Sequence, residues 1–316
     1  MSPPGLPTEL RDRLREVLPA EALALIVSDD SHATTHHSPT SIRLNPLRAD
    51  PIETLGALRS ASIECAPVGW CDFAFTTAAT VRELQSLARH SSGAFHIQSL
   101  SSMIPPLLLA AQPGEAVLDL CAAPGSKTSQ IAAMMRNRGR LIALDSSRPR
   151  LYRLREVLRV LGAHAECICA HGERWGRGHP MQFDRVLVDV PCSGEGRIHL
   201  GDERALADWS RTKVTRLASL QKALLHSAID ALRPGGTLVY STCTYAPEEN
   251  ELVVQRALER YADRIELIPI VHPLPGAAPA LTQWGGALLH PSLSLARRIL
   301  PPLEGFFVAA LRKLPS

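Results

Sequence analysis

The chain has 316 residues, 45% of them hydrophobic and 21% charged, and its mean hydropathy of +0.01 is that of an ordinary globular protein. No apolar run approaches the roughly 20 residues of a membrane-spanning helix, and the first residues lack the basic and apolar segments of a secretory signal. We therefore expect a cytoplasmic protein that is not bound to a membrane. The formal net charge of +3 fits a polyanionic partner and a solvated surface equally well.

Residues 1–92 are predicted to form a small α+β module. Apolar side chains recur at helical spacing over residues 6–27, and the Ser, Asp, His and Thr residues that follow predict an exposed loop over 28–40. We favour a solvated loop over a metal site, since no Cys or paired acid lies at ligand spacing from its histidines, His32, His36 and His37. A strand, a helix and a second strand are expected at residues 41–45, 52–61 and 63–68.

A second pattern begins at residue 93 and continues to residue 316. Short apolar runs alternate there with helical stretches, which is typical of a parallel sheet with crossover helices. Seven strands are expected, at residues 116–120, 139–145, 167–169, 185–190, 236–240, 265–271 and 305–311. A long helix over 214–232 should end before Pro234-Gly-Gly. The fold class is therefore α/β, a doubly wound seven-stranded sheet of the Rossmann-like type.

The first of these strands runs into the segment Cys121-Ala-Ala-Pro-Gly-Ser-Lys-Thr. Ligands of doubly wound sheets bind at the carboxyl ends of the strands, and Asp145, 20 residues beyond Gly125, stands where an acid accepts ribose hydroxyls. The segment matches neither phosphate-binding glycine pattern, because Pro124 fixes a turn and Gly125 is its only glycine. A nucleoside ligand without phosphates fits better, with S-adenosylmethionine the obvious candidate, although a tight turn with a surface Asp remains the alternative.

The seven cysteines are odd in number and widely scattered, which predicts reduced thiols rather than a disulfide framework. Cys192 and Cys243 lie directly beyond two strands, so adjacent parallel strands would bring both to one edge although 51 residues separate them. Their position among Gly, Ser, Thr and Pro favours function. The others are expected to be packing residues, and strand packing is favoured over a partial metal site for the Cys167-x-Cys169-x-His171 sequence.

Three motifs carry a resemblance to a known family, and they are Cys121-Ala-Ala-Pro-Gly-Ser-Lys-Thr, Asp189-Val-Pro-Cys-Ser-Gly-Glu-Gly and Ser241-Thr-Cys-Thr-Tyr-Ala-Pro-Glu-Glu-Asn-Glu. In this order they resemble the signature of the Fmu/Sun family of RNA cytosine-5 methyltransferases, which includes bacterial ribosomal RNA enzymes and the eukaryotic NSUN proteins. Weaker matches extend the resemblance to about residues 40–313. The opening segments are most similar to the bacterial small-subunit ribosomal RNA members.

The resemblance implies that a methyl group passes from S-adenosylmethionine to carbon-5 of a cytosine in RNA. Cys243 would be the nucleophile that adds to carbon-6, and Cys192 would assist loss of the carbon-5 proton and release of the enzyme. Asp189 would hydrogen-bond the cytosine edge and Lys127 would lie near the base or the cofactor carboxylate. The cofactor-binding residues would be Cys121, Ala122, Ala123, Pro124, Gly125, Ser126, Lys127, Asp145, His171 and Asp189.

One position departs from the family pattern. His171 lies near where family members carry an acid that reads the adenine side of the cofactor, so either His171 or Glu173 would have to take that part. Three other classes fit part of this pattern. A DNA cytosine-5 methyltransferase would take its nucleophile from the Pro191-Cys192 motif, a small-molecule methyltransferase leaves the thiol pair unexplained, and a non-catalytic ribosome-assembly factor would keep the fold without turnover.

The expected partner is RNA, with ribosomal RNA favoured over transfer RNA by the resemblance of the opening segments. Residues 1–92 would contact it. A target base would have to be extruded, because both carbon-5 and carbon-6 must be reached. We expect a monomer with no metal.

Overall fold

The computed structural model describes residues 6–27, 39–198 and 207–315. They form two compact units. Unit 1 draws on Met1–Ser31, Glu173–Met181 and Val188–Ser316, and unit 2 on His32–Gly172 and Gln182–Leu187. His32, His36 and His37 lie outside the described residues. The division expected at residue 93 and the RNA contacts of residues 1–92 stay predictions.

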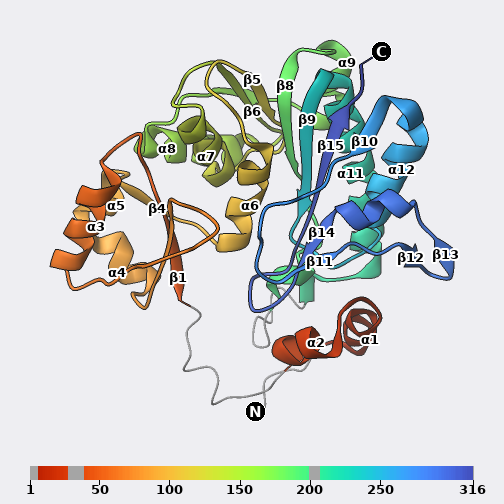
Figure 1. Cartoon of the computed structure of the whole chain (residues 1–316), viewed down its shortest axis with the longest axis horizontal. Coiled ribbons are helices and arrows are strands. Elements are labelled where there is room, and N and C mark those ends of the chain that lie inside the picture. Colours follow the sequence, from red (N-terminus) through yellow and green to blue (C-terminus); the bar gives the residue numbers. More distant parts are fainter. Residues whose placement is uncertain (1–5, 28–38, 199–206, 316) are drawn as a thin grey trace. The chain divides into compact units, whose positions relative to one another are not determined.

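Unit 2 begins with a small antiparallel sheet in the order β2-β3-β1-β4. Its strands and the helices beside them in Figure 1 are β1 (Thr40–Leu44), α3 (Pro51–Ser60), β2 (Ala66–Pro67), β3 (Ala74–Thr77), α4 (Val81–Ser86), α5 (Ala88–Ser91) and β4 (Phe95–Ile97). The expected first strand and helix are confirmed, and α3 starts where Asp50 caps the N–H groups of Ile52 and Glu53. The second strand is only two residues long, since Pro67 has no N–H to donate.

The larger part of unit 2 is a parallel sheet in the order β8-β5-β6-β7. Its elements are α6 (Leu100–Leu109), β5 (Ala116–Asp119), α7 (Ser126–Met134), β6 (Arg140–Asp145), α8 (Arg148–Leu161), β7 (Glu166–Cys169) and β8 (Phe183–Asp189). The strand interiors are apolar and fully buried, as a sheet covered on both faces requires, and include Val117, Leu118, Ile142, Ala143, Val186 and Leu187. The four strands expected in this region are confirmed.

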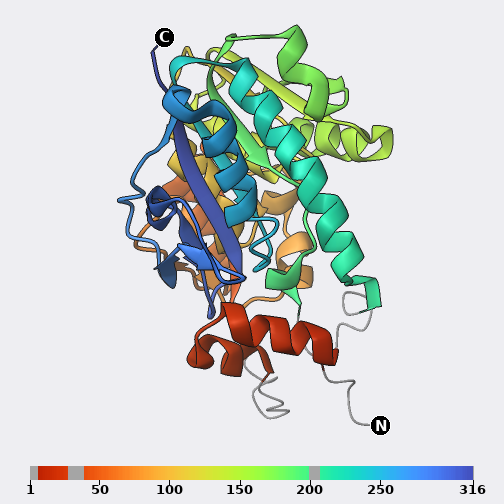
Figure 2. The same ribbon diagram turned by 90° about the vertical axis from the view of Figure 1, so that its right-hand side faces the viewer.

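Unit 1 holds an antiparallel group of strands in the order β11-β14-β15-β9, with β10 paired to β15. Helices α11 and α12 lie on one face of β9 and β15 (Figures 1 and 2). The main elements are α11 (Arg211–Ala231), β9 (Leu232–Thr242), α12 (Glu251–Tyr261), β10 (Ile265–Leu267), β11 (Ala277–Pro279), β14 (Arg297–Ile299) and β15 (Phe306–Lys313). Shorter elements are α9 (Gly172–Gly178), η2 (Glu195–Arg197), η3 (Ala262–Arg264), β12 (Gln283–Trp284), β13 (Ala287–Leu288) and η4 (Pro291–Leu295).

Two expectations for unit 1 need correction. The long helix ends at Ala231 and Leu232 is already extended (φ −72°, ψ 134°), so Pro234-Gly-Gly lies inside β9 rather than stopping the helix. The opening helical stretch is two helices, α1 (Thr8–Val17) and α2 (Ala20–Val27). They separate at Leu18, which is extended (φ −109°, ψ 143°) because it precedes Pro19.

All seven expected strands are therefore present, as β5 to β10 and β15, and β11 and β14 add to them. The α/β class is confirmed. Within the described ranges, no helix is long and apolar enough to cross a membrane.

Candidate active site

Cys192 and Cys243 come together in unit 1, as their positions after two strands predicted. The chain beyond β8 lies beside β9, since the N–H of Val190 donates to Ser241 O at 3.1 Å. The two Sγ atoms are 3.1 Å apart, and the N–H of Cys243 donates to Cys192 Sγ at 3.2 Å. Both residues are partly buried.

The proton state of the pair follows from this geometry. The hydrogen bond to Cys243, then burial, then the charge of Cys243 raise the pKa of the Cys192 thiol well above its usual value. Glu249 adds to the same effect. Cys192 therefore keeps its proton at neutral pH, and its S–H can donate a hydrogen bond to a thiolate at Cys243.

Two charged side chains border the thiols. Asp189, at the end of β8, accepts a hydrogen bond from Ser241 Oγ at 2.8 Å, which fixes its Oδ1 atom. The charge of Cys243, and after it those of Cys192, Glu304 and Asp189, raise the pKa of Arg197. Arg197 is therefore a positive charge near the two thiols, and the sequence patterns did not single it out.

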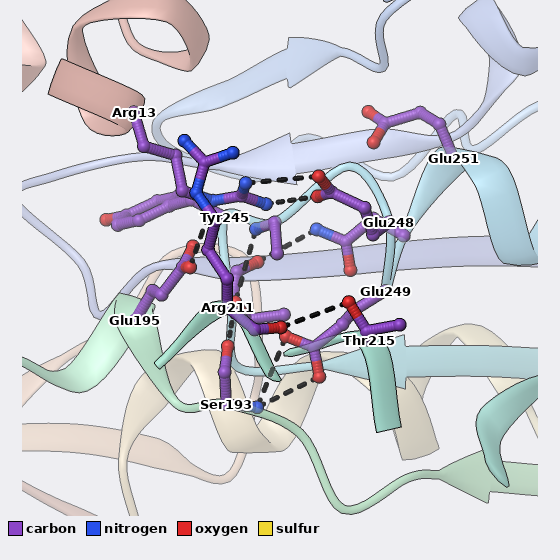
Figure 3. A network of polar contacts seen from close by, with 12 residues as sticks. Arg13, Ser193, Glu195, Arg211, Thr215, Tyr245, Glu248, Glu249 and Glu251 are labelled. Carbon is purple, nitrogen blue, oxygen red and sulfur yellow. Dashed lines mark hydrogen bonds and ion pairs between the residues drawn. The ribbon is translucent and has the colours of Figure 1, made fainter. Parts of the chain in front are cut away.

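The loop that follows Cys192 is fixed by a buried carboxylate. The N–H of Ser193 donates to Glu249 Oε1 at 3.0 Å, and Gln221 Nε2 donates both to Glu249 Oε1 at 2.8 Å and to Pro191 O at 2.9 Å (Figure 3 shows the Ser193–Glu249 contact). Ser193 Oγ and Thr244 Oγ1 are 2.7 Å apart, so this loop is also hydrogen-bonded to the loop of Cys243. The third motif contains Glu249, but the sequence patterns predicted no role for Glu249 or Gln221.

The turn at η2 approaches Cys243 from the Cys192 side. The N–H of Gly196 donates to Cys243 O at 3.0 Å, and the N–H of Gly305 donates to Gly196 O at 2.8 Å. A Cβ atom on Gly196 would meet Gly305 O at 2.0 Å, so only glycine fits there.

The Cys121–Lys127 segment belongs to unit 2, where it connects β5 to α7. The N–H of Ala122 donates to Leu144 O at 2.7 Å, which holds the segment against the end of β6. Gly125 adopts a φ of +114°, and a Cβ atom there would approach Leu154 Cδ1 to 2.9 Å. Gly125 therefore lets the segment pack closely on α8, and Ala122 and Ala123 beside it are small.

Two residues of the small sheet hold the start of α7. His96 Nε2 and Ser126 Oγ are 2.8 Å apart, and Arg43 donates to Ser129 Oγ at 2.7 Å. Burial and then the charge of Arg43 lower the pKa of His96 to about 3, so its ring is neutral. Sequence analysis assigned neither residue to the site.

Asp145 lies at the end of β6, and it is buried beside the same segment. Its Oδ1 atom accepts from the N–H of Ser147 at 2.9 Å, and its Oδ2 atom lies 3.4 Å from Arg150 Nη2. Arg150 Nη2 also donates to Ala123 O at 2.7 Å, so one guanidinium joins Asp145 to the loop. His171 is exposed just beyond β7, whose Cys169 pairs with Asp145.

The expected site residues therefore fall into two groups. Unit 1 brings together Cys192, Cys243 and Asp189, whereas unit 2 holds the 121–127 segment and Asp145, with Lys127 half-buried in the first turn of α7. Among residues 6–27, 39–198 and 207–315, no group of three or more His, Cys, Asp and Glu side chains is arranged to hold a metal ion.

A doubly wound sheet with a small-residue loop after one strand and an acid at the end of the next belongs to the Rossmann-like class of nucleotide-binding enzymes. A crystal structure described as a methyltransferase homolog protein from Pyrococcus horikoshii shares the fold with a TM-score of 0.78 and 31% identity, covering 98% of this chain and all of that one (100%). A structure of NSun6 from the same organism with SFG has a TM-score of 0.79 at 21% identity, covers 99% of both chains and supports the fold alone.

Residues 106–312 match the family described as 16S rRNA methyltransferase RsmB/F, and the chain belongs to that family. The resemblance to the Fmu/Sun family is thus confirmed. A curated relative from Cronobacter sakazakii, "Ribosomal RNA small subunit methyltransferase F", is 38% identical over 98% of this chain. The chain spans 64% of the length of that relative.

Proposed function

We propose that the chain transfers a methyl group from S-adenosylmethionine to carbon-5 of a cytosine in small-subunit ribosomal RNA. The observation that carries this proposal is the pair of sulfur atoms 3.1 Å apart on Cys192 and Cys243. Carbon-5 of cytosine is too weak a nucleophile to take a methyl group unaided, and a second thiol next to the nucleophile provides the base that such a reaction needs. Membership of the RsmB/F family supports RNA of the small subunit as the substrate class.

Cys243 is the proposed nucleophile. Its thiolate adds to carbon-6 of the cytosine, and the electron pair of the carbon-5 to carbon-6 double bond becomes available to attack the methyl group. Arg197 favours the thiolate through its positive charge, and the S–H of Cys192 stabilises it by donating a hydrogen bond. Asp189, held by Ser241, would hydrogen-bond the cytosine edge and stabilise the addition product.

Cys192 changes from a hydrogen-bond donor to a base once the adduct has formed. The carbon–sulfur bond removes the charge of Cys243 and its hydrogen bond, which are two of the causes that raise the pKa of Cys192. Loss of these two causes lowers the pKa of Cys192, so its thiol can pass its proton to solvent water, and the resulting thiolate takes the proton from carbon-5. The double bond re-forms, the bond to carbon-6 breaks, and Cys243 leaves as a thiolate.

The residues of unit 2 fit S-adenosylmethionine. Gly125 packs the loop against α8, Ala122 and Ala123 are small, and the buried carboxylate of Asp145 can accept ribose hydroxyls. Bound there, the cofactor would supply a methyl group on a sulfonium. Lys127 is proposed to lie near the base or the cofactor carboxylate, and exposed His171 near the adenine. A monomer without a metal is also part of the proposal.

The test is transfer of labelled methyl from S-adenosylmethionine to an unmodified 16S rRNA transcript and to small ribosomal subunits. We expect label in 5-methylcytosine with at least one substrate. Label in another base or atom would contradict the proposal. Cofactor binding without transfer to either substrate would favour a ribosome-assembly factor that keeps the fold.

A further inference from the structure

Arg13 is a charged residue on the buried face of the N-terminal helix α1. It is 5% exposed, and its neighbours on that face, Leu10 and Leu14, belong to an apolar cluster with Trp209 and Tyr245. Burying an arginine in such surroundings costs free energy, because its charge loses its hydration. Its partners must therefore be specific, and they explain why it is there.

The guanidinium of Arg13 contacts two glutamates (Figure 3). Its Nη1 atom donates to Glu248 Oε1 at 3.1 Å, its Nη2 atom donates to Glu248 Oε2, and its Nε atom lies 3.3 Å from Glu195 Oε1. Glu195 is 2% exposed, and its Oε1 atom also accepts from Trp209 Nε1 at 2.9 Å. The two carboxylates share one cation.

Each glutamate belongs to the loop of one thiol. Glu195 opens η2, shortly after Cys192, and Glu248 follows Cys243 in the loop before α12. Arg13 is therefore a bridge between the two loops, additional to the Ser193–Thr244 hydrogen bond. The positions of the sulfur atoms depend on the separation of these loops.

Removal of Arg13 would leave Glu195 buried without its cation. Burial raises the pKa of Glu195, and Arg13 is the first group that lowers it again, ahead of Trp209. Without Arg13, Glu195 must take up a proton or turn toward water. Either response changes η2, whose Gly196 donates to Cys243 O.

We propose that Arg13 is a positioning residue for the thiol pair: by binding Glu195 and Glu248 at once, it fixes the two loops so that Cys192 and Cys243 stay in contact. Helix α1 is then part of the thiol site, and its Arg13 serves the reaction rather than the capture of RNA. The kinetic consequence rests on the proposed function, whereas the effect on the thiols does not.

The first test measures the thiols alone in the full chain. Diamide oxidises two neighbouring thiols to a disulfide and takes up the two electrons and two protons, and peptide mapping identifies the Cys192–Cys243 product. We expect Arg13→Gln to slow this cross-link about 10-fold or more, because disulfide formation requires close sulfurs. Arg13→Lys keeps the charge but not the two-pronged guanidinium, so its cross-linking rate should lie between those of the unchanged protein and Arg13→Gln.

Arg15→Gln is the matched control. Arg15 lies on the same helix, its side chain is 60% exposed, and it pairs with Asp12. The control removes the same charge and should cross-link as the unchanged protein does. Circular dichroism and a melting temperature well above the assay temperature establish that each variant is folded.

The second test separates positioning from RNA binding. With a 16S rRNA transcript, Arg13→Gln should lower kcat about 10- to 100-fold and leave KM for RNA within about 2-fold, since loss of reactive geometry acts on the chemical step. A folded Arg13→Gln protein that cross-links at the normal rate would overturn the proposal, and so would a raised KM with unchanged kcat. Absence of transfer in the unchanged protein, with a slowed cross-link in Arg13→Gln, would contradict the proposed function alone.

Discussion

The Sγ atom of Cys192 lies 3.1 Å from the Sγ atom of Cys243, although 51 residues separate them in the chain. The contact arises because the loops carrying both residues follow neighbouring strands, and because Val190 and Gly196 hydrogen-bond the backbone around Cys243. Two thiols at this distance share a proton, so the chemistry of each depends on the state of the other.

Arg197 should control how reactive Cys243 is. Its positive charge favours the thiolate, so Arg197→Gln should slow alkylation of Cys243 by iodoacetamide about 3- to 10-fold at pH 7.5. Mass mapping of the alkylated peptides gives the rate at this one thiol. Arg177→Gln, an exposed arginine of α9, serves as the control and should leave the rate unchanged. An equal rate in Arg197→Gln and in the control would refute this role.

Glu249 should make the protein less stable as pH rises. Burial raises the pKa of Glu249 above that of the unfolded chain, although Ser193 and Gln221 oppose the shift. Its contribution to the free energy of unfolding is full below the unfolded pKa, near 4.3, and is lost as pH rises through the folded pKa. Glu249→Gln should remove this loss. Urea unfolding at pH 5 and pH 8 should show that the free energy of unfolding falls less between those values in the variant than in the unchanged protein.

The same Glu249→Gln variant has a control in Glu259→Gln. Glu259 is exposed at the end of α12, where it accepts from Gln255 and Arg256. The control should not alter the trend between pH 5 and pH 8. A Glu249→Gln protein with the same trend as the unchanged chain would show that Glu249 titrates normally.

His96 should have the opposite effect in acid. Its pKa is lowered to about 3, so between that value and its unfolded value of about 6.5 the unfolded chain binds a proton that the folded chain does not. The stability contributed by neutral His96 is full above about pH 6.5 and falls as pH drops, by up to about 1.4 kcal/mol per pH unit. The free energy of unfolding, measured by heat and by urea from pH 7 to pH 4.5, should therefore fall less steeply in His96→Gln. Exposed His164→Gln is the control, and an unchanged slope in His96→Gln would contradict the prediction.

Asp145→Asn tests the cofactor site without the RNA. The substitution removes the charge while keeping an oxygen for the N–H of Ser147. Loss of a charge-assisted hydrogen bond to a ribose should weaken S-adenosylmethionine binding by about 10-fold, or roughly 1.5 kcal/mol. Titration calorimetry gives the affinity, with exposed Asp12→Asn as the control. Equal affinities would remove Asp145 from the site.

The local patterns were sufficient for much of the fold and for the thiols. Period and length predicted every strand from β5 to β10 and β15, because a short apolar run is typical of a buried strand, but the antiparallel pairing of β15 with β9 and β10 was not predicted. Cys192 and Cys243 were identified because strand ends gather at one edge. The break at Leu18 was missed, although Pro19 was a local signal for it.

Arg13 could not have been found in the same way. It stands on a helix with other arginines, and its partner Glu248 is 235 residues away. The spacing of Leu10, Leu14 and Val17 places Arg13 on the apolar face of α1 and Arg15 off it, but it does not reveal which residue would pair with a buried Arg13. Glu249, Gln221 and Arg197 were missed for the same reason: each acts through neighbours that only the folded chain supplies.

The most direct test of the two-thiol reaction is the covalent complex with RNA. Cys192→Ala, incubated with S-adenosylmethionine and 16S rRNA transcript, should accumulate an RNA–protein adduct that survives denaturing electrophoresis, because Cys243 adds but is not released. Cys243→Ala and the double variant should form none. An adduct in Cys243→Ala, or rapid turnover without adduct in Cys192→Ala, would contradict the assignment of Cys243 as the nucleophile and Cys192 as the group that releases it.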